Sequence, residues 1–314
     1  MLFCIFAVYA LFLSNIYSYE FPFSTLGNSI IDANGIIVRT KCVTWPGSME
    51  TLLPEGLQHN SIDNIVLLIK EMNMTCVRLT YSIDVTRSSN LTVYQSLSRL
   101  NLILALEGFI ENNPLLIHKS ISYVFDSVLN TLGKYNILVL LDNHISKAMW
   151  CCHKFDGNGF WGDQYFDVEQ WIDGLIFMAK KTINRPYVIA MIYEAHWYSW
   201  SNYGHSTECN KMKAGIQNAW GFILEPDHSY TAPVWLTEFG TNVDQFTGDN
   251  TFIDCVKGFF QTSFTETMSW SYWVLAGSYY IRSGTIELHE SFGLLTDNWK
   301  EIKSKSFIDI LSTM

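Results

Sequence analysis

Short apolar runs alternate along the chain with longer segments in which apolar residues recur every three or four positions. The short, continuous runs predict β-strands that are covered on both faces, and the longer segments predict amphipathic helices. Strands that alternate with helices form βα units and a parallel sheet, so the expected fold class is α/β. The six expected strands are residues 41–45, 76–81, 137–144, 188–198, 233–240 and 268–275.

The helical pattern is clearest in residues 61–72, 121–132 and 166–181. Ser61 is placed to cap the first of these helices, and Gly133 is placed to end the second. No internal repeat, low-complexity tract or linker rich in Pro, Gly and Ser divides the chain. We therefore expect residues 19–314 to form a single domain.

Residues 1–17 form an apolar stretch that is short for a membrane span and is followed by the small residue Ser18. This stretch predicts a signal peptide over residues 1–18, and hence a secreted protein, with an N-terminal signal anchor as the alternative. The sequons at Asn73 and Asn90 agree with a secreted glycoprotein.

An even number of cysteines in a secreted chain predicts disulfide bonds, and the spacings here do not match a zinc site. The neighbours Cys151 and Cys152 are expected to reach two separate partners. The six cysteines that follow the predicted signal peptide are Cys42, Cys76, Cys151, Cys152, Cys209 and Cys255.

The formal net charge of −10 and the absence of a Lys/Arg cluster argue against nucleic acid or an anionic membrane as the main partner. This acidity suits a cleft of carboxylates and aromatic rings, although it also simply keeps a secreted protein in solution. Residues 157–163 contain glycines but no Walker lysine, and neither a G-x-S-x-G elbow nor an H-E-x-x-H motif occurs. Because His144, His153 and His205 are scattered, we expect no metal and no cofactor.

Polar and aromatic side chains gather at the carboxyl ends of five expected strands, where barrel enzymes place their reactive groups. For any one of these side chains an ordinary strand-end role is the alternative. They are Arg78, Asn143, His144, His196, Tyr198, Glu238 and Trp273. Candidates to stack on sugar rings, each with a core role as the alternative, are Trp150, Trp161 and Trp273.

Cleavage of a glycosidic bond with retained configuration uses two carboxyl groups about 5–5.5 Å apart, one ionised and one protonated. Glu238 ends an apolar run, so its carboxylate is expected in a cleft, with a salt-bridged or capping glutamate as the alternative. A neighbouring Arg78 would lower the pKa of Glu238. Alternation along a strand places Glu194 on the same face as His196 and Tyr198.

Several segments together resemble glycoside hydrolase family 5, the cellulase family, and most closely its secreted cellulase-like members from plants and fungi. The resemblance runs from about Gly35 to Phe307, and LLDNHISKAMWCC followed by FDGNGFWGDQYF is its most specific part. The other segments are CVRLTY, YEAHWYSW, WLTEFG, and WSYWVLAGSYY with the following FGLLTDNW.

The resemblance implies a (β/α)8 barrel of the TIM type, retaining chemistry and no cofactor. It implies that Glu238 is the nucleophile and that Trp273 lies under the reactive sugar. The other matched positions, which would bind substrate, are Arg78, Asn143, His144, His196 and Tyr198. The implied partner is an oligo- or polysaccharide of the β-glucan or β-mannan type, or a glycolipid, bound by a monomer without stable membrane insertion.

One element of the family pattern is missing. The family places its general acid/base in an Asn-Glu dipeptide at the end of strand 4, and no Asn-Glu dipeptide occurs in this sequence. The likeness to strand 4 stops at residues 188–191, and the next residues already resemble strand 6. We therefore expect an incomplete barrel with about six of eight βα units. In it, the run 188–198 joins residues that resemble strand 4 of the family to residues that resemble strand 6.

Three explanations are open: a mispredicted or alternatively spliced product, an inactive descendant, or replacement of the missing acid/base by Glu194. The expected function is a secreted, retaining glycoside hydrolase that acts on β-linked glycans in polysaccharide breakdown. The alternatives are a catalytically dead carbohydrate-binding relative and a truncated product.

Overall fold

The structure, a computed structural model, describes residues 19–153, 155–189, 193–201, 208–248, 250–262, 265 and 267–314. The expected signal peptide, His205 and the Met191–Ile192 junction lie outside the described residues. Within the described ranges, no helix combines the length and the apolar character that a membrane crossing requires.

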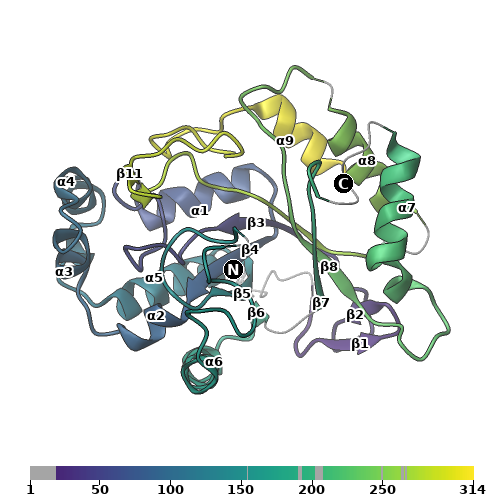
Figure 1. The fold of residues 1–314 in the computed structure, drawn as a ribbon, viewed down its shortest axis with the longest axis horizontal. Coiled ribbons are helices and arrows are strands. Elements are labelled where there is room, and N and C mark those ends of the chain that lie inside the picture. The colour runs from purple at the N-terminus through teal and green to yellow at the C-terminus, as the bar shows by residue number, and fades with distance from the viewer. Residues whose placement is uncertain are drawn as a thin grey trace, which may run out of the picture.

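A seven-stranded parallel sheet forms the centre of the molecule, with helices packed around it (Figure 1). Its spatial order is β6-β5-β4-β3-β9-β8-β7, so β9, the last strand of this sheet along the chain, pairs with β3, the first. This order is that of a (β/α)8 barrel opened at one place. The strands are β3 (Lys41–Trp45), β4 (Cys76–Ser82), β5 (Leu138–Ile145), β6 (Val188–Ile189), β7 (Tyr193–Trp197), β8 (Val234–Phe239) and β9 (Trp270–Tyr272).

The expected incomplete barrel is therefore confirmed, but the run 188–198 is two strands rather than one. β6 pairs with β5 through the partners Val139 and Val188, whereas β7 pairs with β8 through the partners Tyr193 and Val234. The two strands thus form opposite edges of the sheet. A continuous apolar run predicts extended backbone, but it does not say which neighbour each half will pair with. The six expected runs account in this way for seven strands.

Helices follow most of the strands, and the three expected helices are all present. Ser61 caps α1 as expected, because its side chain accepts a hydrogen bond from the Asn64 amide. Gly133 does not end α5, which continues to Lys134. The helices are α1 (Ile62–Glu71), α2 (Ile83–Arg87), α3 (Val93–Ser98), α4 (Ile103–Asn112), α5 (Ile121–Lys134), α6 (Val168–Thr182), α7 (Cys209–Ala219), α8 (Thr251–Phe260) and α9 (Lys305–Ser312), with the 3₁₀ turns η1 (Pro114–Leu116) and η2 (Gly221–Leu224).

A separate apolar cluster fills the amino end of the barrel. It joins inward-facing strand residues, among them Cys76, Leu140 and Trp235, to Ile30 and Val38 from the N-terminal segment. That segment carries the antiparallel hairpin of β1 (Ser24–Leu26) and β2 (Ser29–Ile31). A second small hairpin, β10 (Ile281–Arg282) with β11 (Thr285–Ile286), lies near the carboxyl end of the chain. The interior is therefore plugged at one end and can hold a site only at the other.

The cysteines form three disulfides, which confirms that expectation: Cys42–Cys76, Cys151–Cys152 and Cys209–Cys255. The first joins β3 and β4 at partner positions of the ladder. The expectation that Cys151 and Cys152 reach separate partners was wrong, because the two neighbours bond to each other. Cys151 and Cys152 lie in the loop after β5. The other four described cysteines are paired with one another, between β3 and β4 and between α7 and α8.

Packing of α5 against the sheet gives a direct test of the core. We expect Leu129→Ala, in α5, to lower the free energy of unfolding by about 3 kcal/mol, since the Leu129 side chain is fully buried and its removal leaves a cavity. The matched helical control is Leu104→Ala in α4, where the leucine is 75% exposed and the expected change is about 0.5 kcal/mol or less. Urea denaturation measures both, and equal losses would contradict the described packing.

Candidate active site

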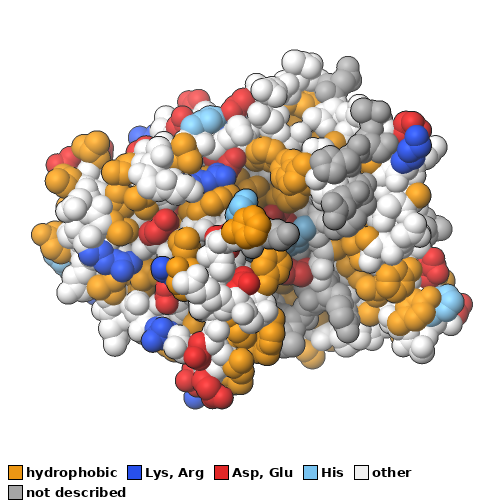
Figure 2. Space-filling view, viewed as in Figure 1, with side chains coloured by type: hydrophobic (Ala, Val, Ile, Leu, Met, Phe, Trp, Pro, Cys, Tyr) orange, Lys and Arg blue, Asp and Glu red, His pale blue; other side chains and the backbone are white. Residues whose placement is uncertain are grey.

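A pocket of about 600 Å³ opens at the carboxyl ends of the barrel strands. Side chains from β4, β5, β7 and β8 and from the segment after β9 converge on it, as the parallel order of these strands requires. In the space-filling view, hydrophobic side chains gather beside the hollow at the centre of the face (Figure 2). The predicted residues that line the pocket are Arg78, Asn143, His144, Trp150, Glu194, His196, Tyr198, Glu238 and Trp273.

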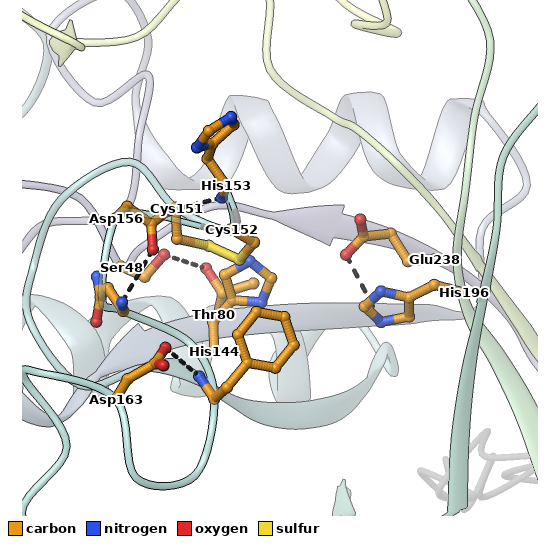
Figure 3. The surroundings of a disulfide bond; sticks show 12 residues. Ser48, Thr80, His144, Cys151, Cys152, His153, Asp156, Asp163, His196 and Glu238 are labelled. Atoms are coloured by element: carbon orange, nitrogen blue, oxygen red, sulfur yellow. Dashed lines mark hydrogen bonds and ion pairs between the residues drawn. A yellow bond between two sulfur atoms is a disulfide. The ribbon is translucent and has the colours of Figure 1, made fainter. Parts of the chain in front are cut away.

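The carboxylate of Glu238 is held by donors on both of its oxygens. Arg78 Nη1 donates to Oε2 at 2.9 Å, and the Tyr198 hydroxyl donates to Oε1 at 2.7 Å. His196 Nε2 lies 3.8 Å from Oε2, and Figure 3 shows the two side chains facing each other. The side chain of Glu238 keeps an exposed fraction of 12%, so it is fixed in position and still faces the pocket.

The pKa of Glu238 lies below its ordinary value. Burial raises this pKa, but the electrostatic interactions with His196, Arg78 and His144 and the hydrogen bond from Tyr198 lower it by more. Glu238 is therefore a carboxylate at neutral pH and becomes protonated only as the pH falls through this lowered pKa.

Arg78 is the cation on which the carboxylates of the pocket converge. Its side chain is fully buried, with Nη2 3.0 Å from Asp142 Oδ2 and 3.7 Å from Glu194 Oε2. Burial lowers the pKa of Arg78, but Asp142, Glu238 and Glu194 raise it to a net value above the ordinary one. The guanidinium is therefore charged at neutral pH.

Asp142 belongs to the site, although the sequence analysis did not single it out. Burial raises its pKa, but Arg78 and His144 lower it to about 2, so this carboxylate stays ionised. Its Oδ2 is 3.0 Å from His144 Nδ1. Alternation along β5 would have identified it, because Asp142 stands two positions before His144 and so shares its face.

Glu194 lies in the same pocket and is the most exposed of the three glutamates that line it, with a side-chain exposed fraction of 47%. Its Oε2 accepts a hydrogen bond from Thr237 Oγ1 at 3.0 Å. The ladder between β7 and β8 shifts register between Ala195 and His196, next to this position. The strand thus presents Glu194, His196 and Tyr198 to the pocket together, as alternation predicted.

Aromatic rings form one wall of the pocket. The His144 ring stacks on Trp273 with a centroid distance of 5.7 Å and an interplanar angle of 16°, and Trp150 contacts Trp273 at 6.2 Å. The Arg282 guanidinium lies 3.4 Å above the Trp150 ring and is paired with Glu290 at 2.6 Å. The sequence analysis did not name Arg282 or Glu290, because the Trp150 ring that places Arg282 at the pocket lies far away in the sequence.

Two predicted residues have lesser roles. Asn143 lines the pocket, but its amide Nδ2 donates to the Ile145 carbonyl at 3.3 Å, within its own strand. Trp161 is not brought to the pocket: it is 69% exposed and contacts Phe166 and Trp171. Pocket-lining aromatics that the sequence analysis did not name are Phe160, Trp200 and Phe292.

Solved structures of cellulases share this fold. The catalytic domain of the major endoglucanase from Xanthomonas campestris pv. campestris superposes with a TM-score of 0.63 at 15% identity, over 93% of this chain and 99% of that one. An endocellulase from Pyrococcus horikoshii in complex with cellotetraose gives a TM-score of 0.67 at 13% identity, over 94% and 98% of the two chains. At these identities the likeness is one of fold.

A sequence relative identifies the family, although no family model matches the chain. A glycosyl hydrolase 5 family protein from Chamaecyparis obtusa is 30% identical over 371 aligned positions, which cover 94% of this chain and 66% of the relative. Since 94% of 314 residues is about 295, about 75 aligned positions belong to the relative alone. The chain, which spans about two thirds of that relative's length, belongs to glycoside hydrolase family 5.

Proposed function

We propose that the protein acts on β-linked glycans as a retaining glycoside hydrolase, with Glu238 as its nucleophile. The environment of Glu238 carries this proposal: an ionised carboxylate in a pocket at the ends of the barrel strands, held on both oxygens by Arg78 and Tyr198. Family membership and the cellotetraose bound by the Pyrococcus horikoshii endocellulase support a carbohydrate partner.

In this mechanism Glu238 attacks the anomeric carbon of a sugar seated against Trp273 and Trp150, and the bond to the leaving oxygen breaks. The resulting glycosyl-enzyme is hydrolysed by water, which restores the carboxylate. Arg78 and Tyr198 hold the carboxylate in line with the reacting carbon, so that its orientation is fixed before the substrate arrives.

The leaving oxygen also needs a proton, and here the chain departs from its family. The sequence has no Asn-Glu dipeptide, and β6 ends at Ile189, directly before residues outside the described part of the chain. We propose Glu194 as the substitute donor, because it is the exposed carboxyl group that shares the pocket with Glu238. General acid catalysis contributes about 10²–10⁴-fold to rate, so imperfect placement of Glu194 restricts turnover to good leaving groups.

Secretion is part of the same proposal. The three disulfides suit an oxidising compartment, and the chain begins with the apolar stretch expected of a signal peptide. We further propose that the protein works as a monomer on oligo- or polysaccharides or on glycolipids, and that nucleic acid is not a partner.

The nucleophile is tested with two kinds of β-cellobioside. In one kind the leaving group is dinitrophenolate, which departs without being protonated. In the other it is a sugar hydroxyl, which must be protonated as it departs. We expect measurable turnover of the aryl glycoside and a loss of at least about 10³-fold in Glu238→Gln, since the amide cannot form the glycosyl-enzyme. We expect Glu194→Gln to slow the sugar leaving group by at least about tenfold and the aryl one far less. Equal effects on both substrates would reject Glu194 as the acid, and wild-type turnover by Glu238→Gln would reject the nucleophile.

A non-catalytic carbohydrate-binding protein is the second candidate function, and the missing Asn-Glu dipeptide favours it. In that case folded protein binds cello-oligosaccharides without hydrolysing them. We expect Trp273→Ala to weaken binding by at least about tenfold in isothermal titration, since an aromatic platform is lost. Trp161→Ala is the matched control and should bind as wild type, because Trp161 lies outside the pocket. Turnover that depends on Glu238 would exclude this candidate.

The acid limb of the pH–rate profile tests how Glu238 is held. The folded protein lowers the pKa of Glu238, so activity that needs its anion is present above this pKa and is lost as the pH falls through it. In Tyr198→Phe one interaction that lowers the pKa is gone, and we expect the acid limb of kcat/KM to move to higher pH. Tyr94→Phe, at an exposed tyrosine, should leave the limb in place. An unmoved limb in Tyr198→Phe would contradict the assignment.

A further inference from the structure

The Cys151–Cys152 disulfide lies at the pocket beside His144. Both cysteines and His144 line the pocket, and one potential ligand atom from each lies within 4.8 Å of the others. Figure 3 shows the His144 ring directly next to the two sulfur atoms. Ligand atoms around a tetrahedral zinc ion are about 3.5–3.8 Å apart, given bonds of about 2.0 Å to nitrogen and 2.3 Å to sulfur. The separation between His144 and the sulfur atoms is thus at most about 1 Å above metal-site spacing, whereas the two sulfurs are bonded to each other and move apart only after reduction.

His144 is already oriented as metal-binding histidines usually are. Its Nδ1 is bonded to Asp142 Oδ2 at 3.0 Å, and Asp142 is fixed in turn by Arg78. Metal-ligating histidines generally bind a carboxylate through the ring nitrogen that faces away from the metal. The stacking of the ring on Trp273 fixes its plane as well. Nε2 is therefore the nitrogen of His144 that remains for a metal.

The three disulfides differ in access. Cys42 and Cys76 are fully buried inside the barrel, and Cys255 is 1% exposed. Cys152, in contrast, is exposed in a loop at the pocket, outside the helices and strands. Thiol–disulfide exchange requires a thiolate to reach a sulfur atom, so a small dithiol attacks this bond first. The loop position lets the two sulfurs separate without disturbing the sheet.

We propose that Cys151, Cys152 and His144 form a metal site for a thiophilic divalent cation when the pocket disulfide is reduced. A dithiol transfers two electrons and two protons to the disulfide, giving two cysteine thiols and an oxidised cyclic disulfide of the reductant. Binding of Zn²⁺ to both sulfurs and to His144 Nε2 then releases the two thiol protons, and water completes a four-coordinate site. The absence of a metal site had been expected from the spacings of the cysteines and of the histidines along the sequence.

The chemical consequence is a cation inside the glycan pocket. His144 stacks on Trp273, and both residues face the space that a sugar would occupy. The reduced, zinc-bound form would therefore exclude a glycan from the pocket, whereas the disulfide form leaves the pocket open. This consequence rests on the proposed carbohydrate function, but the metal site itself does not.

The site is tested on the full chain without any activity measurement. Limited reduction followed by removal of the reductant should expose two additional thiols per chain, placed at Cys151 and Cys152 by peptide mapping. Titration with Co²⁺ should then give one equivalent bound, with the near-ultraviolet absorption of thiolate–cobalt bonds, and Zn²⁺ should displace it. The disulfide form should give no such absorption. Two free thiols at these cysteines without stoichiometric cobalt binding would overturn the proposal.

Two histidine variants locate the third ligand. We expect His144→Ala to weaken Co²⁺ binding by the reduced protein more than tenfold, while His153→Ala, next to Cys152 but outside the cluster, should bind as wild type. The reverse ranking would overturn the assignment of His144. Tryptophan fluorescence of each variant before reduction is compared with that of the wild type to establish that all are folded. The double variant Cys151→Ser/Cys152→Ser should fold yet give no thiolate–cobalt absorption. Retained absorption in that double variant would also contradict the site.

Discussion

The buried guanidinium of Arg78 is the interaction on which the pocket depends. It contacts carboxylates from three other strands, namely Asp142, Glu194 and Glu238. Removing one partner from a buried ion pair is costly, about 3–5 kcal/mol, because the remaining charge loses its compensation. Here a single cation compensates the negative charges of three carboxylates. One comes from β5, in the half of the open sheet that ends at β6, and two come from β7 and β8, in the other half. The same contacts that hold the strand ends in place also keep Glu238 ionised, so the stability of the pocket and its chemistry have a common origin.

The opening of the barrel explains why this arrangement matters. β6 and β7 are opposite edges of one sheet, and within the described residues no strand lies between them. A closed barrel fixes its strand ends by hydrogen bonds all the way round, whereas an open one lacks that constraint at the seam. In this protein, the cluster at the amino end and the ion pairs of Arg78 at the carboxyl end both connect strands across the interior. The site therefore persists although the barrel is incomplete.

The sequence predicted the features that depend on local pattern. Strand alternation placed His196, Tyr198 and Glu194 on one face. The incomplete barrel, in contrast, was implied by the resemblance to the family, in which the segments between strands 4 and 6 are present. What could not be predicted depends on distant partners. The run 188–198 divides between two edges of the sheet because of its pairing with β5 and β8. The place of Arg282 follows from its contact with Trp150, more than 130 positions earlier. The Cys151–Cys152 bond was missed for the opposite reason: the loop lets immediate neighbours pair, which spacing rules disfavour.

The pocket separates two requirements of glycoside cleavage that the family normally meets together. The proposed nucleophile, Glu238, needs a fixed and ionised carboxylate, and its hydrogen bonds with Arg78 and Tyr198 favour that state. The leaving group needs a carboxyl group that holds a proton and lies opposite the nucleophile. In this pocket the two requirements fall on carboxyl groups with different surroundings. Both oxygens of Glu238 accept hydrogen bonds from Arg78 and Tyr198, whereas the Glu194 side chain is 47% exposed and lies 3.7 Å from Arg78 Nη2.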